Sequence, residues 1–238
     1  MTIEPQRYFA EQLVDTLFTI DCMVSAGISP ETYDPTPTQL TRLAESKAYF
    51  GIGPVGFEQA WLNRLKQNNP NVRFFDTSKG IDPITTEWAH GDHTHTGTDP
   101  HIWSSPKEAK VIVKNMRDAL VELDKANTQL YTANCENLIR EIDNTDKEMR
   151  SLLENSSQKA FIIYHPALTY LARDYGLAQY AIEVDGKEPS AAQIKTLIDT
   201  AKSNSIKTIF IQEEFDKKNA EMIAEGSGCR LMVINPLS

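Results

Sequence analysis

Along the first 75 residues, apolar side chains occur either at helical spacing or in short continuous runs. Helical spacing of apolar side chains predicts three helices, over Pro5–Leu17, Thr38–Ser46 and around Phe57–Leu65. Short apolar runs predict three strands, over Phe18–Val24, Ala48–Ile52 and Val72–Phe75. Strands separated by single helices indicate βαβ units and a parallel sheet, in which ligands bind at the carboxyl ends of the strands.

The middle of the chain, from Ser105 to Asn155, has a different pattern. It holds almost no glycine, and Pro106 stands where a helix can begin. Apolar positions keep helical spacing throughout, and a polar break at 124–127 divides them into two helices. The second helix, of about 28 residues, should be about 40 Å long at 1.5 Å per residue. That length spans a small domain, so we expect this helix to tie two lobes together.

The alternation of strands and helices then resumes. The pattern predicts strands over Ala160–Tyr164, Gln179–Glu183, Ile206–Gln212 and Arg230–Ile234, and helices over Ala167–Tyr175, Ser190–Ser203 and Lys217–Ala224. Because the last residue follows soon after a strand, we expect a further helix in the complete C-terminal lobe. The sequence therefore predicts an α/β protein of two lobes with mostly parallel central sheets: an N-terminal lobe over 1–123, a linker helix over 124–155 and a C-terminal lobe over 156–238.

Composition narrows the class of protein. Apolar residues make up 40% and charged residues 24%, as in an ordinary globular protein. The net charge of −9 argues against a nucleic-acid partner, which requires clustered Lys and Arg. No apolar run approaches the roughly 18 residues that cross a bilayer, and no signal peptide is recognisable in the chain as given. Cys22, Cys135 and Cys229 lie far apart without a Cys-x-x-Cys spacing, which excludes a thiolate zinc knuckle.

The five histidines fall in two places. His101 lies in Asp99–Trp103, directly after a polar run that holds three of the others, and His165 ends the apolar stretch 161–164. Imidazole is the commonest metal ligand in proteins. This distribution predicts a transition-metal site, with zinc as the preferred ion.

The residues at predicted strand ends are the candidate ligands. Glu31 follows the first predicted strand, His101 precedes the helical middle, and His165 and Asn235 end strands of the second half. Because loops at the carboxyl ends of parallel strands converge, we expect these groups to meet in the cleft between the lobes.

The polar run 90–96 contains His90, His93 and His95 among Gly, Asp and Thr residues. Such a loop has few apolar residues to bury, so ordering it costs conformational entropy without compensation. We expect a mobile loop outside the tight metal site. It either gathers zinc weakly through its histidines or serves as a plain flexible linker.

Several motifs in fixed order resemble one family. They are Ser-Pro-x-x-Tyr-x-Pro-x-Pro at 29–37, Asp-Pro-His-Ile-Trp with a following Ser-Pro at 99–106, His-Pro-Ala-Leu-x-Tyr-x-Ala-x-x-Tyr-Gly-Leu at 165–177, Glu-Pro-Ser at 188–190 and Pro-Leu at 236–237. In this order they resemble the metal-binding solute-binding proteins of bacterial zinc/manganese ATP-binding-cassette importers, the cluster A-I zinc-receptor group. The likeness covers nearly the whole chain.

The resemblance implies a function and a set of ligands. It implies a monomeric protein outside the cytoplasm, associated with the membrane, that delivers zinc or, less readily, manganese to the permease of an importer. It places metal ligands at 31, 101, 165 and 235, and a linker helix at 126–153. This chain departs from the family at two of these positions, because Glu31 replaces the usual histidine and Asn235 the usual aspartate.

The chemistry of these side chains supports zinc independently of the resemblance. Two imidazoles and the carboxylate of Glu31 suit tetrahedral Zn²⁺ at about 2.0–2.2 Å, whereas manganese prefers more oxygen ligands. The fourth ligand stays open between Asn235, a glutamate such as Glu213 or Glu214, and water. Each ligating histidine should donate its other ring N–H to an acceptor that the sequence does not identify.

Two other functions remain as alternatives. A zinc-dependent hydrolase would use the same ligands with Glu183, Glu213 or Glu214 as general base, although no His-Glu-x-x-His helix is present. A scaffold or adhesin with a degraded metal site is the second alternative, because Glu31 and Asn235 depart from the family's ligands.

Overall fold

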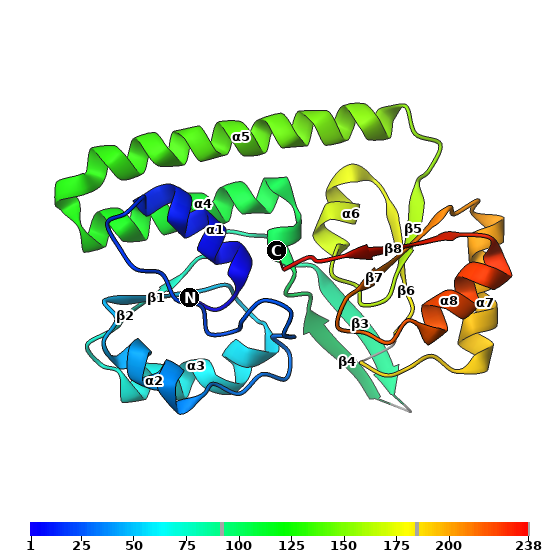
Figure 1. The fold of residues 1–238 in the computed structure, drawn as a ribbon, viewed down its shortest axis with the longest axis horizontal. Coiled ribbons are helices and arrows are strands. Elements are labelled where there is room, and N and C mark those ends of the chain that lie inside the picture. The colour runs from blue at the N-terminus through cyan, green and yellow to red at the C-terminus, as the bar shows by residue number, and fades with distance from the viewer. Residues whose placement is uncertain (91–92, 184–185, 238) are drawn as a thin grey trace. The chain divides into compact units, whose positions relative to one another are not determined.

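The computed structural model of the chain describes residues 1–90, 93–183 and 186–237, with the side chains of 86–96 left out of the description. It divides into two compact units, 1–145 together with Leu237, and 146–236 (Figure 1). The division falls within α5 (Thr128–Glu154), which continues from one unit into the other. The lobe boundaries expected at 123/124 and 155/156 flank this helix and stay a prediction.

The first unit begins with helices and a small parallel sheet. Its elements are α1 (Glu4–Val14), α2 (Pro37–Ala44), β1 (Ala48–Gly51), α3 (Gly56–Asn68), β2 (Arg73–Asp76), β3 (Thr85–His90), β4 (His93–Thr98), η1 (Ile102–Ser104), α4 (Pro106–Leu123) and η2 (Lys125–Asn127). β1 and β2 pair in parallel, with Ala48 opposite Arg73 and Gly51 opposite Asp76, and α3 connects them. The βαβ unit predicted for this region is therefore confirmed.

The strand predicted over Phe18–Val24 is wrong. The segment has no strand conformation, and the backbone hydrogen bonds at its end run to residues 1 and 2. The backbone N–H of Met23 donates to the carbonyl of Met1, and that of Val24 to the carbonyl of Thr2, both at 2.9 Å. Glu31 consequently follows a loop and not a strand.

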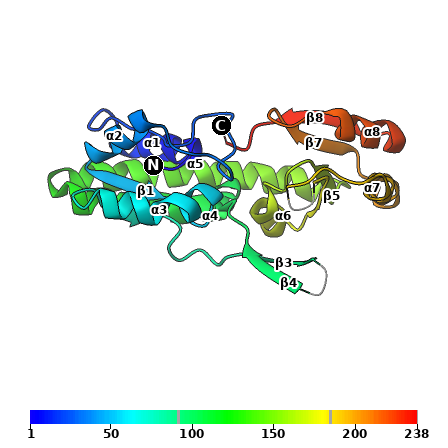
Figure 2. The ribbon, with the colours of Figure 1, turned by 90° about the horizontal axis from the view of Figure 1, so that it is seen from below.

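The polar run 90–96 also differs from the irregular loop that its composition predicts. β3 and β4 form an antiparallel hairpin with Thr85 opposite Thr98 (Figure 2). Threonine at every second position from 94 to 98 favours strands, and backbone pairing needs no buried side chain. Residues 91–92 and the side chains of His90, His93 and His95 lie outside the described residues, so the mobility of this segment stays a prediction.

The two predicted central helices are confirmed as α4 and α5. Ser105 caps the first, since its hydroxyl accepts the backbone N–H of Lys107 at 3.1 Å, and Pro106 follows at the first helical position. Asp124 stabilises the break between the helices: its carboxylate accepts from Asn127 at 2.7 Å and from the Tyr131 hydroxyl at 2.8 Å. These two hydrogen bonds lower the pKa of Asp124. α5 has 27 residues, close to the predicted length.

The second unit is a parallel sheet covered by helices. Its elements after α5 are β5 (Ala160–Ile163), α6 (Thr169–Tyr175), β6 (Ala178–Ala181), α7 (Ala191–Ser203), β7 (Thr208–Gln212), α8 (Lys218–Ser227) and β8 (Arg230–Ile234). The strand order is β6-β5-β7-β8, with every pair parallel, as predicted.

Each face of this sheet has its own apolar cluster. Ile162, Ile209 and Ile211 pack with side chains of α7 and α8 on one face. Phe161 and Ile163 pack with Ala172 of α6 on the other (Figure 1). This burial on both faces explains why the two central strands, β5 and β7, are nearly continuous apolar runs. It also brings the carboxyl ends of β5, β7 and β8 to one edge of the sheet.

A buried carboxylate connects the elements of the first unit. Glu58 of α3, only 6% exposed, accepts the backbone N–H groups of Ile52 at 2.7 Å and Gly53 at 3.2 Å. It also accepts the hydroxyl of Thr2, which in turn lies 2.7 Å from the hydroxyl of Tyr49. Burial raises the pKa of Glu58, although these three hydrogen bonds act in the opposite direction.

This raised pKa predicts a pH-dependent effect of Glu58→Gln. A pKa that is higher in the folded state gives a contribution to stability that is present at low pH and is lost as pH rises through the folded-state pKa. Glutamine cannot ionise, so the free energy of unfolding of the variant should rise relative to wild type between about pH 4 and pH 7. Urea unfolding at several pH values measures this difference. The exposed Glu136→Gln on α5 is the matched control, and a pH-independent difference at Glu58 would contradict the prediction.

Candidate metal centre

His101 lies between β4 and η1, and its ring is held by Asp99. The Oδ1 atom of Asp99 accepts the backbone N–H of His101 at 2.9 Å and lies 2.9 Å from Nδ1 of the ring. Both residues are buried: His101 is 6% exposed and Asp99 is 7% exposed. The indole of Trp103 packs edge-on against the imidazole, with the ring centroids 5.2 Å apart. These contacts fix the orientation of the ring.

The local sequence explains this arrangement. Asp99 donates its backbone N–H to the carbonyl of Ile84 at 2.8 Å, which anchors the turn after β4. The carbonyl of Pro100 accepts the N–H of Ile102 at 2.8 Å, and the hydroxyl of Ser104 donates to the carbonyl of His101 at 2.8 Å. The Asp-Pro-His-Ile-Trp segment is thus a compact turn that leads directly into α4.

His165 directly follows Tyr164 at the end of β5 and contacts a carboxylate in the same way. Its Nδ1 lies 2.6 Å from Oε1 of Glu183, which comes after β6. The ring stacks on Phe215 with centroids 5.9 Å apart and an angle of 23° between the planes. The side chain of His165 is 24% exposed and that of Glu183 is 10% exposed. This histidine is therefore more open than His101.

Gln212 holds the backbone of His165. Its side chain donates to the carbonyl of His165 at 2.8 Å and accepts the N–H of His165 at 3.3 Å. Gln212 ends β7 and is 1% exposed. The sequence analysis did not single out this residue. The available signal was a polar side chain at the carboxyl end of an otherwise apolar strand.

Glu31 lies in an exposed loop that contacts the start of α3. Its Oε2 accepts the backbone N–H of Gly56 at 3.1 Å, and the carbonyl of Pro30 accepts the N–H of Phe57 at 2.8 Å. The positive end of the helix dipole favours a carboxylate at this position. A Cβ atom at Gly56 would lie 2.8 Å from the Cα of Glu31 and closer still to its carbonyl oxygen. Only glycine permits this approach.

The predicted ligands belong to different units. Glu31 and His101 are in the first unit, whereas His165 and Asn235 are in the second. Among the described residues of either unit, no three His, Cys, Asp or Glu side chains gather as a metal-binding group. Asn235 directly follows β8, and Glu213 and Glu214 are exposed in the turn after β7. The complete ligand set therefore stays a prediction.

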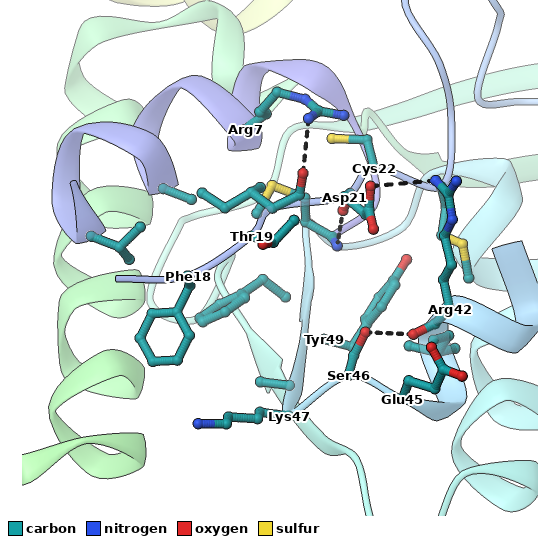
Figure 3. A pocket seen from close by; sticks show the side chains of 18 of the residues that line it. Arg7, Phe18, Thr19, Asp21, Cys22, Arg42, Glu45, Ser46, Lys47 and Tyr49 are labelled. Atoms are coloured by element: carbon teal, nitrogen blue, oxygen red, sulfur yellow. Dashed lines mark hydrogen bonds and ion pairs between the residues drawn. The ribbon is translucent and has the colours of Figure 1, made fainter. Parts of the chain in front are cut away.

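A pocket of about 790 Å³ in the first unit contains none of the predicted ligands (Figure 3). It lies between β1, α1 and the segment that was predicted as a strand. On its wall Arg7 donates to the carbonyl of Ile20 at 2.9 Å, and Arg42 pairs with Asp21 at 3.7 Å. Burial raises the pKa of the Cys22 thiol to about 11, so this thiol is a poor metal ligand.

The family of the chain is shown by a match over its whole length. A model of the family described as zinc-uptake complex component A, periplasmic, matches residues 1–238. The chain belongs to this family, and the resemblance inferred from its motifs is confirmed.

Individual relatives agree with this assignment. The high-affinity zinc uptake system protein ZnuA of Bacillus subtilis is 29% identical over 249 residues, which cover 99% of this chain and 77% of that protein. The zinc-binding lipoprotein AdcA of Streptococcus pneumoniae is 26% identical, and this chain spans about half of it, 49%. A crystal structure of ZnuA superimposes with a TM-score of 0.91 at 39% identity, covering 100% of this chain and 90% of that one. The predicted fold class is confirmed.

The contact between Glu31 and α3 predicts the effect of Gly56→Ala. If helix propensity alone mattered, alanine would stabilise α3 by up to about 1 kcal/mol. The close approach of the Glu31 backbone should reverse this sign, and we expect a loss of about 1–3 kcal/mol from overpacking. Chemical unfolding of the two proteins measures the change. An increase in stability would show that the loop of Glu31 is not packed against the helix.

Proposed function

We propose that this chain captures zinc outside the cytoplasm and, as a monomer, delivers it to the membrane permease of an ATP-binding-cassette importer. The observation that carries this proposal is the family match over residues 1–238. The names of the Bacillus and Streptococcus relatives describe zinc uptake and zinc binding by those proteins. Because the chain spans only part of these relatives, delivery to a permease is inferred for the whole protein.

We further propose that Glu31, His101 and His165 bind the transported ion. The two histidines support this role because each is oriented by a carboxylate at Nδ1, the arrangement typical of metal-ligating imidazoles. Two nitrogen ligands and one carboxylate oxygen favour zinc over manganese. Asn235, one of the glutamates Glu213 and Glu214, or water completes the tetrahedron.

Two further observations bear on this proposal. Among the helices of the described residues, none is both long and apolar enough to cross a membrane. The hydrolase alternative needs a general base next to the ligands; of its three candidates, Glu183 already has Oε1 at 2.6 Å from Nδ1 of His165, while Glu213 and Glu214 are exposed. No observation favours hydrolysis over capture.

The proposed ligands predict the outcome of histidine replacement. His101→Ala and His165→Ala should each weaken zinc binding by at least about tenfold, because each removes one of the protein ligands of a tetrahedral site. Isothermal titration calorimetry gives the affinity and the stoichiometry. The matched control replaces His90, His93 and His95 together by alanine, which should leave one tight zinc per chain. Unchanged affinity in both single variants would contradict the assignment.

Zinc affinity should fall steeply between about pH 7 and pH 5. A neutral imidazole binds the metal, so protons compete with zinc for the site. Two histidines should displace about two protons at low pH, and the dependence should be shallower than at a site with three histidines. Calorimetry in buffers of different ionisation enthalpy counts these protons. A pH-independent affinity would mean that the histidines are not ligands.

A further inference from the structure

We propose that Asp99 and Glu183 are positioning residues that make both histidines present Nε2 to the metal. The proposal rests on the proposed function, since it concerns the same histidines. An ionised carboxylate can only accept hydrogen bonds, so the nitrogen that faces it must carry the proton. In a neutral imidazole the other nitrogen then holds the lone pair that binds a metal. Both rings face a carboxylate through Nδ1, so both should bind through Nε2.

The side chain of Asp99 accepts a backbone N–H of its own turn, and its main chain donates to the carbonyl of Ile84. One oxygen, Oδ1, serves both the main-chain N–H and the ring Nδ1 of His101. Trp103 additionally packs against the ring, and the side chains of Asp99 and His101 are only 6% and 8% exposed. His101 is therefore held by packing as well as by its hydrogen bond. Loss of the charge alone should move this ring little.

Glu183 holds the ring of His165 through a hydrogen bond. His165 has Phe215 stacked on its ring, whereas its side chain is 24% exposed. The two hydrogen bonds between the side chain of Gln212 and His165 are both to the main chain of His165 and not to the imidazole. The 2.6 Å contact between Nδ1 of His165 and Oε1 of Glu183 opposes rotation of the ring about its side-chain bonds. We therefore expect loss of the Glu183 carboxylate to weaken zinc binding.

The first test follows the tautomers in metal-free protein. Two-bond ¹H–¹⁵N correlation spectra, recorded where the histidines are neutral, should show wild-type His101 and His165 protonated at Nδ1. Glu183→Leu should shift His165 towards the tautomer mixture of a free imidazole and leave His101 unchanged as an internal reference. Glu183→Gln keeps an acceptor oxygen and should retain the Nδ1–H form. A His165 tautomer that is the same in the leucine variant and in wild type would overturn the proposal.

The second test measures zinc affinity in the same variants. Glu183→Leu should weaken binding by about 10- to 100-fold, the range for lost supporting groups of metal-ligating histidines. Glu183→Gln and Asp99→Asn should recover most of the affinity, because both keep an acceptor at Nδ1. The exposed Glu225→Leu on α8 is the matched control, and circular dichroism checks that each variant is folded.

The outcomes separate this inference from the function on which it rests. Wild-type protein that binds no zinc would overturn the proposed function, whatever the tautomers show. Wild-type protein that binds zinc tightly, with Glu183→Leu binding it equally well, would overturn the positioning role and leave zinc capture standing. A loss in the leucine variant that glutamine rescues would support both.

Discussion

The contact between a carboxylate and Nδ1 of an imidazole is the interaction on which the proposed metal chemistry depends. A histidine has two ring nitrogens, and a hydrogen bond at one of them decides both the tautomer and the direction of the other. The chain makes this contact twice, at His101 and at His165, and the carboxylate reaches the ring from a different place in the fold each time. Asp99 is two residues before its histidine in one tight turn, whereas Glu183 lies just after β6, the strand next to β5 in the sheet.

The parallel sheet of the second unit brings the parts of the His165 environment together. β5 lies between β6 and β7, so the residues that follow these strands meet at one edge. Glu183 arrives from beyond β6, and Gln212 ends β7. Backbone pairing fixes the register of these strands, and apolar clusters cover both faces of the sheet. Gln212 shows that a polar group can be buried at a strand end when it satisfies the backbone of its neighbour.

In the first unit, helix termini and buried polar groups hold the loops. The loop of Glu31 contacts the start of α3 through two hydrogen bonds, and the same helix carries Glu58, which binds the turn after β1. Glycine at position 56 is required because the loop backbone comes within contact distance. The carboxylate of Glu31 is thus ordered by the helix in the structure described, and a bound cation would have to share it with the N–H of Gly56.

The sequence by itself determined the elements whose signal is local and strong. Apolar periodicity predicted β1 and β2, the two central helices and all four strands of the second unit, since burial on one or two faces imposes a regular pattern on neighbouring residues. The motifs around His101 and His165 indicated the family. Tertiary structure alone decided what depends on partners distant in the chain. Phe18–Val24 has no strand conformation, and its Met23 and Val24 donate backbone N–H groups to the carbonyls of Met1 and Thr2. Glu183 and Gln212 contact His165 across 18 and 47 positions, and no spacing rule predicts such contacts because sheet order creates them.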